Sequence, residues 1–231
     1  VETCRTAGVR TVMITGDHAS TARAIGRELD IFRPGDLVVT GAELDEMDDA
    51  ALDEAARNTS VFARVSPLHK LRIVRALQHA GEVCAMTGDG VNDAPALKAA
   101  DIGVAMGITG TDVAKDASDM ILMDDRFTTI VYAVREGRRV FRNIQKVVSF
   151  LVADNVAQIV VLLTAVALNW NAPLTAVMIL WVNLATASLP ALALGVEPAS
   201  RHIMEHPPMR VNNLLDGPLA RRVIFQGVFI A

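Results

Sequence analysis

The sequence predicts a mixed protein, in which a parallel α/β half-domain precedes a transmembrane α-helical hairpin and the start of a third membrane helix. Two observations support this fold class. Strand-like and helix-like segments alternate over residues 1–126, which is typical of a parallel sheet with helices between its strands. Residues 147–196 then carry a single formally charged side chain, Asp154, and a further apolar run follows at residues 223–231.

The composition excludes several classes of protein. The 231 residues include 22 basic and 26 acidic side chains, and the net charge of −4 gives no support to nucleic-acid binding. Hydrophobic residues make up 52% of the chain, too many for a disordered protein, and charged residues make up 21%, too many for a pure membrane bundle. The chain does not begin with Met and its last apolar run is short, so both ends are expected to be cut from a longer protein.

The elements of residues 1–126 follow from short apolar runs and their boundaries. β-branched runs such as 9–14 predict strands, and apolar residues at helical spacing predict helices. Ser66 and Pro67 predict a helix start, with the serine as cap and the proline in the first turn, and Gly81 predicts its end. In order, the predicted strands are 9–14, 37–40, 82–86, 102–105 and 120–123, and the predicted helices are 21–29, 41–58, 66–81, 94–100 and 111–118.

The second part, residues 147–231, is predicted to lie in a membrane behind a helical, basic stalk at residues 127–146. Two apolar stretches at 147–168 and 174–196 are long enough to span a bilayer, and a third span begins at about residue 220. Basic residues flank the hairpin but not its turn, so the positive-inside rule places residues 1–146 in the cytoplasm. The flanking cations include Lys146 before the first span and Arg201, Arg210, Arg221 and Arg222 after the second.

Two predicted strands end in the same tripeptide, Thr-Gly-Asp, at residues 15–17 and 87–89. The carboxyl ends of parallel strands meet at one edge of a sheet, where ligands bind. Glycine lets the backbone approach a phosphate closely, threonine offers a hydroxyl, and a following helix start offers free N–H groups. A single Thr-Gly-Asp is better explained as a structural turn, so this pattern alone does not establish a phosphate site.

Side chains near the second tripeptide have the chemistry of a magnesium and phosphate site. Mg²⁺ prefers one or two carboxylates together with phosphate oxygens, and Asp89 and Asp93 supply carboxylates across a glycine-containing loop. Asn92 lies between them and can hydrogen-bond a phosphoryl oxygen. Lys70 can neutralise a phosphoryl group during its transfer. These four side chains are therefore candidate catalytic residues.

The segment 87–98, T-G-D-G-V-N-D-A-P-A-L-K, resembles the hinge signature of P-type ATPases, the cation pumps of the haloacid-dehalogenase-like phosphotransferase superfamily. Residues 13–17, 61–70 and 110–125 resemble three further motifs of this family in order and spacing. The resemblance covers essentially the whole chain. It implies a parallel, Rossmann-like fold for residues 1–126, the C-terminal part of a phosphorylation domain.

The resemblance also implies roles for individual residues. Asp89 matches the Mg²⁺-ligating aspartate of the family, and Asp93 matches its second hinge aspartate. Lys70 and Asn92 match residues that contact the phosphate. Thr15 and Gly16 match groups that hold the phosphoryl group, and Asp17 lies beside them, so these three are candidate catalytic and cofactor-binding residues. Arg64 is expected to lie near the nucleotide.

The function that the resemblance implies is that of part of an ATP-driven cation pump with an aspartyl-phosphate cycle, which uses Mg²⁺ and ATP. The implied partners are ATP, a transported cation, the lipid bilayer and the remaining domains of the same pump, with the plasma membrane as its location. The family's nucleophile lies in a D-K-T-G-T motif that this sequence lacks, so the fragment alone is expected to be inactive. The alternatives are a membrane-tethered phosphatase of the same superfamily and a non-catalytic membrane partner module.

Polar side chains in membrane helices are costly, which makes them candidates for a transported-ion site. The candidates are Asn155, Gln158, Asn183 and Thr186, and hydrogen bonding between helices is the alternative explanation for them. Asn155 and Gln158 are three residues apart and share a helix face. Asp154 adjoins Asn155 and is therefore expected to face elsewhere.

Pro190 is expected to break the second span near residues 186–189 and to free carbonyl groups for a cation. The segment 181–190 resembles W-V-N-L-x-T-D-x-L-P of calcium- and sodium/potassium-type pumps. Ala187 replaces the aspartate of that motif, and Gln158 stands where calcium pumps have a glutamate. Because the charge of the ligands sets affinity for a divalent cation, calcium and a monovalent ion both stay open.

Overall fold

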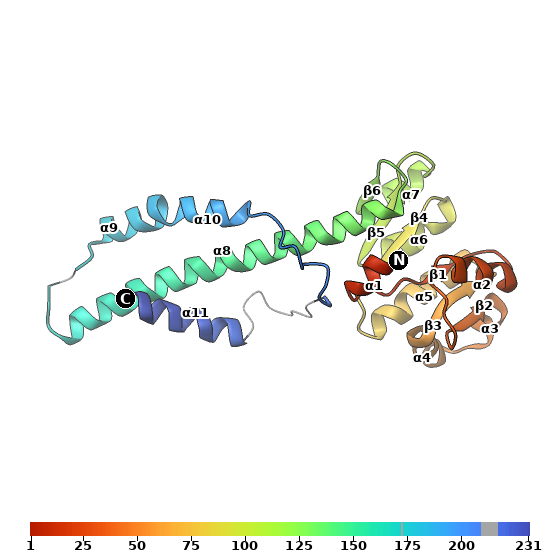
Figure 1. Cartoon of the computed structure of the whole chain (residues 1–231), viewed down its shortest axis with the longest axis horizontal. Coiled ribbons are helices and arrows are strands. Elements are labelled where there is room, and N and C mark those ends of the chain that lie inside the picture. The colour runs from red at the N-terminus through yellow and green to blue at the C-terminus, as the bar shows by residue number, and fades with distance from the viewer. Residues whose placement is uncertain (172, 209–216) are drawn as a thin grey trace. The chain divides into compact units, whose positions relative to one another are not determined.

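The computed structural model describes residues 1–171, 173–208 and 217–231, and it contains two compact units, Val1–Tyr132 and Ala133–Ala231 (Figure 1). Two features expected from the sequence each include a residue outside the described ranges. The turn at residues 169–173 contains Ala172, and the basic flank of the hairpin contains Arg210.

Two parallel three-stranded sheets form the first unit, in the orders β1-β3-β2 and β4-β5-β6. In the first sheet Met13 pairs with Val61, and in the second Thr87 pairs with Val104. The parallel α/β class predicted from the sequence is confirmed. The strands are β1 (Met13–Ile14), β2 (Leu37–Thr40), β3 (Thr59–Ala63), β4 (Ala85–Gly88), β5 (Ile102–Met106) and β6 (Met120–Leu122).

Helix α5 (Pro67–His79) joins the hydrophobic cores of the two sheets. Its Ile73 lies in the cluster that contains Phe62 of β3, and its Val74 lies in the cluster that contains Met86 of β4. Ile14, at the end of β1, packs against both clusters. The other helices of this unit are α1 (Glu2–Thr6), α2 (Ala19–Glu28), α3 (Gly41–Glu46), α4 (Asp49–Asn58), η1 (Val91–Asp93), α6 (Ala94–Ala99) and α7 (Asp112–Asp116).

The predicted start of α5 is confirmed. The hydroxyl of Ser66 accepts a hydrogen bond from the backbone N–H of His69 (3.3 Å), and Nδ1 of His69 accepts one from the N–H of Ser66 (3.2 Å). Pro67 occupies the first turn, where a missing N–H costs nothing. His69 is buried, and its Nε2 lies 2.8 Å from Oδ1 of Asp45. These bonds hold the helical turn that carries Lys70.

Strand β3, the centre of the first sheet, is not predicted from the sequence. Four of its five residues are buried, and the fifth, Ser60, is half-buried. A strand that is buried on both faces does not alternate between polar and apolar residues, so periodicity does not distinguish it from the end of the preceding helix.

Other boundaries differ from the prediction for local reasons. The segment 41–58 forms two helices because the carboxylate of Asp48 accepts a hydrogen bond from the N–H of Ala51 (2.8 Å) and caps α4. Strand β4 begins at Ala85 rather than residue 82, since the N–H of Cys84 donates to the carboxylate of Asp101 (2.8 Å). Strand β1 is limited to two residues.

The second unit consists of helices. Helix α8 (Phe127–Ala167) begins in the first unit and continues for 41 residues, and Gly137 does not interrupt it. Helix α9 (Ala176–Trp181) passes through a π turn, η2 (Val182–Thr186), into α10 (Ser188–Gly195). Helix α11 (Gly217–Ile230) follows.

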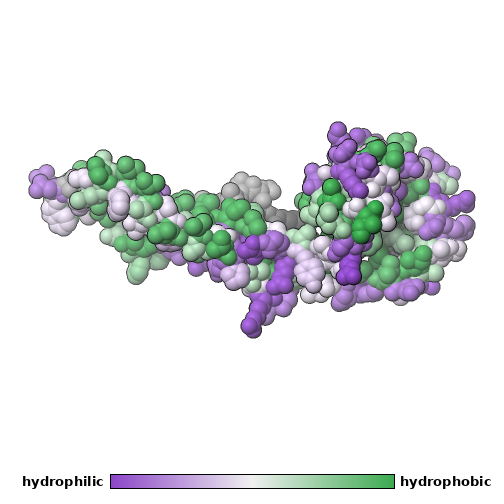
Figure 2. All heavy atoms as spheres, turned by 90° about the horizontal axis from the view of Figure 1, so that it is seen from above, coloured by the Kyte–Doolittle hydropathy of each residue, from purple (hydrophilic) through white to green (hydrophobic). Residues whose placement is uncertain are grey.

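Two helical segments, Phe127–Ala167 and Ala176–Gly195, are long and apolar enough to cross a membrane. Only 17% and 6% of their most apolar stretches are buried. Figure 2 shows apolar residues gathered on the surface of these helices. A core helix of a soluble protein would bury such residues, so this exposure supports the membrane placement expected from the sequence.

The expected break at residues 186–189 takes a different form. The helix is widened one turn earlier, where the N–H of Ala187 donates to the carbonyl of Val182 (2.8 Å) across five residues. Pro190 has no N–H to donate to the carbonyl of Thr186, four residues before it. The π turn therefore replaces the predicted break.

Buried Asn143 fastens the segment after α10 to α8. Its side-chain amide donates to the carbonyls of Gly195 (3.1 Å) and Glu197 (2.8 Å). Arg139 donates to the same carbonyl of Glu197 (3.2 Å), and Lys146 forms an ion pair with the Glu197 carboxylate (2.6 Å). The polar half of α8 therefore fixes the end of α10 through backbone carbonyl groups.

A close approach at Gly227 packs α11 against α8. A Cβ atom at this position would lie 2.6 Å from Cγ1 of Val156 and 2.8 Å from the carbonyl oxygen of Ala153. Val223, one helical turn earlier on α11, is 1% exposed. The contact therefore depends on the absence of a side chain at residue 227.

We expect Gly227→Val to destabilise the second unit by about 1–3 kcal/mol, because the added methyl groups overpack this contact. Denaturant unfolding of the chain in detergent micelles measures the change. Gly217→Ala is the matched control, since nothing lies within 4 Å of a Cβ there. Equal stability of the two variants would contradict the packing role of Gly227.

Candidate functional site

The residues predicted to bind phosphate lie in loops at the carboxyl ends of two edge strands. Thr15, Gly16 and Asp17 directly follow β1, and Asp89 directly follows β4. Each of these strands lies at the edge of its three-stranded sheet. Lys70 comes from the first turn of α5, the helix shared by the two cores.

The loop after β1 is a compact turn tied to the end of β3. The hydroxyl of Thr15 donates to the carboxylate of Asp17 (2.9 Å) and accepts from the N–H of Asp17 (3.1 Å). The carbonyl of Asp17 accepts a hydrogen bond from the N–H of Arg64 (2.9 Å). Gly16, between them, is exposed, and nothing lies within 4 Å of a Cβ built there. The turn therefore leaves open space around its glycine.

The loop after β4 is built around the buried carboxylate of Asp93. One oxygen lies 2.5 Å from Nζ of Lys70, and the other accepts from the N–H groups of Gly90 (3.2 Å) and Asp89 (3.4 Å). The Asp93 side chain is 8% exposed and that of Lys70 is 20% exposed. Gly88 has no room for a side chain, because its Cβ would lie 2.5 Å from Cβ of Asp93. Asp93 thus orients both the loop and the lysine.

The two aspartates of this loop have different environments. Asp93 is already bonded to Lys70 and to the backbone, whereas Asp89 and Asn92 are exposed. Over residues 1–171, 173–208 and 217–231, no three His, Cys, Asp or Glu side chains form a set that could hold a metal ion. Mg²⁺ does not need such a set, because it is bound through one or two carboxylates together with phosphate oxygens and water. Exposed Asp89 fits that donor requirement better than Asp93.

Arg64, predicted to lie near a nucleotide, is exposed and has a left-handed backbone (φ 52°). Non-glycine residues adopt this conformation infrequently. The carbonyl of Arg64 faces Gly41, which has no room for a Cβ against it. The left-handed backbone of Arg64 thus occurs where the segment after β3 packs closely against the start of α3.

The loop after β5 contacts the loop after β4 that carries Asp89. The N–H of Thr111 donates to the carbonyl of Asp89 (2.8 Å). The carboxylate of Asp125 holds the preceding part of the loop, since it accepts from the N–H groups of Gly107, Ile108 and Thr109 at 2.7–2.9 Å and from the Thr109 hydroxyl at 2.8 Å. The N–H of Ile108, followed by the other loop donors, lowers the pKa of Asp125 to about 2.

We expect Asp125→Asn to destabilise the first unit in a pH-dependent manner. The native pKa is below the unfolded value of about 3.9, so this carboxylate stabilises the fold above pH 4 and loses that contribution as the pH falls toward 2. The midpoint of thermal unfolding of the variant should lie below that of the wild type at pH 7. The difference should shrink between pH 4 and 2.

Asp116→Asn is the control for this measurement, because Asp116 is exposed and no hydrogen bond of its side chain is found among the described residues. A difference between Asp125→Asn and the wild type that stays constant down to pH 2 would contradict the proposed hydrogen bonds.

Two predicted membrane residues meet between α8 and the π turn. The amide nitrogen of Gln158 donates to Oδ1 of Asn183 (2.9 Å) and to the carboxylate of Asp154 (2.8 Å). Thr186 closes the π turn that carries Asn183. Together Asp154, Gln158 and Asn183 offer one carboxylate and two amide carbonyl groups, which are donors suited to a hard cation.

The expectation that Asp154 faces away from this cluster is wrong. Asp154 and Gln158 are four residues apart, a spacing that places two side chains on one helix face. Asn155 is exposed, and its amide donates to the carbonyl of Leu151 on its own helix (2.9 Å). Ala187, which replaces the aspartate of the resembling motif, is 3% exposed.

The comparison with known families agrees with both halves of the chain. Residues 1–101 match the model of haloacid dehalogenase-like hydrolases, and residues 171–231 match that of the cation-transporting ATPase C-terminus. Together these two matches support a fragment of a cation-transporting P-type ATPase. In this family context, the two Thr-Gly-Asp turns lie on the hydrolase-like half and the Gln158–Asn183 pair on the membrane half.

Curated relatives from this family match nearly the whole chain. Calcium-transporting ATPase 1 of Bacillus cereus is 51% identical over 98% of the chain, and a calcium-transporting ATPase of Listeria monocytogenes is 52% identical over 100%. A calcium-transporting ATPase of Bacillus subtilis is 48% identical over 96%. The chain spans about a quarter of the length of these relatives (26%, 26% and 25%).

Sequence reasoning misses several residues that support these candidate sites. Asn143 gives no signal in a basic helix, because its partners are backbone carbonyls more than fifty residues later. Thr111 and Asp125 lie in a segment that resembles a family motif, but their bonds depend on how the loop after β5 folds. For Asp154, the spacing to Gln158 is the signal that could have placed it.

Proposed function

We propose that this chain supplies the magnesium- and phosphate-binding part of an ATP-driven calcium pump and part of its ion pathway. The observation that carries the proposal is the loop after β4, where buried Asp93 bonds both to Lys70 and to the backbone of exposed Asp89. The calcium-transporting relatives support Ca²⁺ as the transported ion. Residues 1–146 would lie in the cytoplasm, and the plasma membrane is the proposed location.

The residues of the first unit would bind and orient a phosphoryl group. Asp89 would hold Mg²⁺, which neutralises charge on the transferring group. Lys70 places a second positive charge at the same loop, and its contact with Asp93 limits the positions it can adopt. Gly16 would let a phosphoryl oxygen approach the backbone, and Asn92 would donate a hydrogen bond. The remaining domains of the pump would bind ATP and supply the aspartate nucleophile.

The two edge strands indicate where that nucleophile would enter. Ile14 of β1 packs against the cluster that contains Met86 of β4, so the two edges share one core. Among the strands that the structure describes, β1 pairs only with β3 and β4 only with β5. A strand from the rest of the pump could pair with both edges and end beside the two Thr-Gly-Asp turns.

In the membrane, Asp154, Gln158 and Asn183 would form part of the transport site. One carboxylate and two amides offer less negative charge than calcium sites in proteins commonly use. Other helices of the intact pump would therefore complete the coordination. Thr186 would contribute its carbonyl, which lacks a helical partner from Pro190. Asn155 would contribute its side-chain oxygen, because its bond to Leu151 uses only the amide nitrogen.

An ion panel on the purified full-length protein tests the proposal. ATP hydrolysis would be measured in Mg²⁺ with added Ca²⁺, Mn²⁺, Na⁺ or K⁺. Stimulation by Ca²⁺ is the expected result. Stimulation only by Na⁺ or K⁺ would contradict calcium transport, and a phosphatase without dependence on these ions would contradict the pump.

We expect Asp154→Asn to raise the Ca²⁺ concentration for half-maximal stimulation by at least about tenfold, because it removes the one carboxylate of the cluster. The control is Thr164→Val, which replaces an exposed side chain of the same helix outside the cluster with one of similar size. Calcium dependence unchanged in Asp154→Asn would exclude this residue from the ion site.

A further inference from the structure

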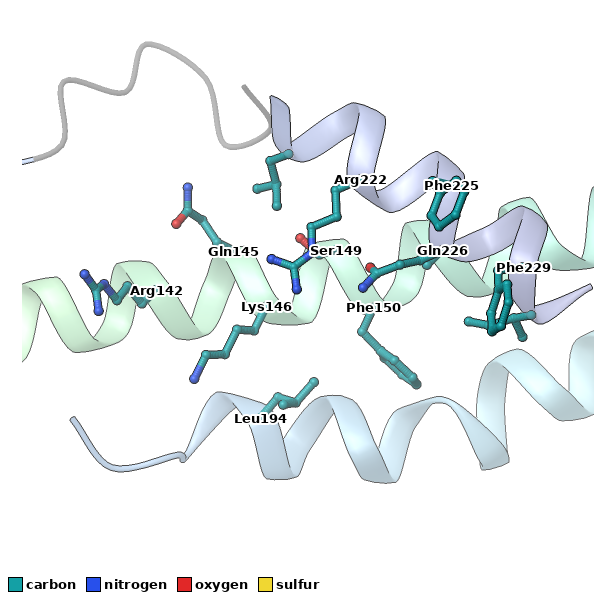
Figure 3. A pocket seen from close by; sticks show the side chains of 13 residues that line it. Arg142, Gln145, Lys146, Ser149, Phe150, Leu194, Arg222, Phe225, Gln226 and Phe229 are labelled. Carbon is teal, nitrogen blue, oxygen red and sulfur yellow. The ribbon is translucent and has the colours of Figure 1, made fainter. Parts of the chain in front are cut away.

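A groove lies between three helices of the second unit, α8, α10 and α11 (Figure 3). Its volume is about 870 Å³, which is within the range of pockets that hold small ligands. Residues 142–153 of α8 form its floor, and Leu194 of α10 and residues 219–230 of α11 form its walls. No residue of the phosphate site or of the Gln158–Asn183 cluster lines it.

The groove is basic at one end and aromatic at the other. Figure 3 shows Arg142 and Lys146 toward one end of α8, with the guanidinium of Arg222 reaching from α11 toward the same helix. Phe225 and Phe229 follow along α11 toward the other end. Both phenylalanines are largely exposed, at 70% and 83%. The groove therefore offers cations and an apolar track to one ligand.

The positive charge at the basic end is only partly neutralised. Lys146 pairs with the carboxylate of Glu197 (2.6 Å). Within the portion of the chain that the structure describes, neither Arg142 nor Arg222 forms an ion pair. Burial, followed by repulsion from Arg142, lowers the pKa of nearby Arg138. This end of the groove therefore favours an anion.

The position of the groove along α8 relates it to the membrane surface. Lys146 is the last basic residue before the apolar stretch of α8, and Phe150 lies one turn inside that stretch. The basic end would thus lie at the level of lipid headgroups, and the aromatic end would lie among acyl chains.

We propose that this groove binds an anionic phospholipid, whose phosphate lies against Arg142 and Arg222 and whose acyl chain lies along Phe225 and Phe229. A phospholipid matches both ends, because it joins a phosphate to an apolar chain. A free phosphate would not use the aromatic end, and an apolar helix from the same protein would leave two arginines without a counter-charge. The inference requires only that the helices lie in a membrane, so it does not rest on the proposed pump activity.

Lipid retention by the full-length protein tests the inference. The protein would be delipidated in detergent, incubated with phosphatidylglycerol or phosphatidylcholine, and examined by native mass spectrometry. We expect one phosphatidylglycerol to be retained in preference to phosphatidylcholine. Each basic contact at a membrane surface is worth about 1 kcal/mol, so Arg222→Gln should weaken this binding roughly fivefold and Arg142→Gln/Arg222→Gln roughly 25-fold.

Arg221→Gln is the matched control. It removes the same charge from the adjacent position of α11, but Arg221 does not line the groove, so lipid retention should be unchanged. Phe225→Ser/Phe229→Ser should weaken phosphatidylglycerol binding without affecting any binding of inorganic phosphate. Equal loss in Arg221→Gln and Arg222→Gln, equal retention of the two lipids, or displacement of the lipid by inorganic phosphate would each overturn the inference.

Discussion

Asp89→Asn in the full-length protein should lower the amount of phosphorylated enzyme formed from radiolabelled ATP by at least about 100-fold. The side chain is exposed at the end of β4, and its loop is held by hydrogen bonds to Asp93 and Thr111 that use backbone atoms of Asp89. Replacement by asparagine keeps the size of the side chain and these backbone bonds. It removes the negative charge that would hold Mg²⁺.

The measurement needs a control for charge and one for folding. Asp116→Asn removes an exposed carboxylate from α7 and should be labelled like the wild type. The thermal unfolding midpoint of Asp89→Asn should also match that of the wild type, because the side chain has little contact with the core. Normal labelling of Asp89→Asn would refute its role in binding the metal.

Lys70→Met should lower both phosphorylation and stability. The substitution leaves the Asp93 carboxylate, 8% exposed, without its cation. Loss of one partner from a buried pair costs about 3–5 kcal/mol, and the 20% exposure of Lys70 places the expected loss near the lower value. Thermal unfolding and phosphoenzyme labelling of the same preparations measure the two effects.

The double variant Lys70→Met/Asp93→Asn separates stability from chemistry. Because it removes both buried charges, it should recover much of the stability lost in Lys70→Met. Phosphorylation should stay low, since no cation faces the phosphoryl group. Lys98→Met, at an exposed position of α6, should change neither quantity. Recovery of labelling in the double variant would show that Lys70 acts only through stability.

In the first unit, local sequence patterns predict features that depend on neighbouring residues, such as helix starts and strand ends. Ser66 and Pro67 define the start of α5 through short-range bonds, and the Thr-Gly-Asp tripeptides mark where two strands end. The pairing of Lys70 with Asp93 joins residues 23 apart in sequence. It depends on how α5 docks beside the loop after β4, which neither local pattern contains.

In the second unit, too, the sequence predicts local features but not the contacts that depend on tertiary packing. The lengths and charges of the apolar stretches predict two membrane-capable helices. The continuity of α8 through Gly137 and the bonds of Asn143 to two distant carbonyls arise from tertiary packing. The contact of Asp154 could have been predicted from the sequence. Asp154 and Gln158 are four residues apart, a spacing that places both side chains on one helix face, whereas the position of Asp154 next to Asn155 says nothing about this contact.

The π turn holds one more residue than an α-helical turn of the same backbone would. If η2 changed to α-helical geometry, that extra residue would pass along the helix and shift its register by one position, a rotation of about 100°. The bonds of Asn143 hold the C-terminal end of α10 in place. The segment that contains Asn183 would therefore be the one that rotates. Its 2.9 Å bond to Gln158 would then break. A change of this one turn from π to α-helical geometry would therefore open the amide cluster.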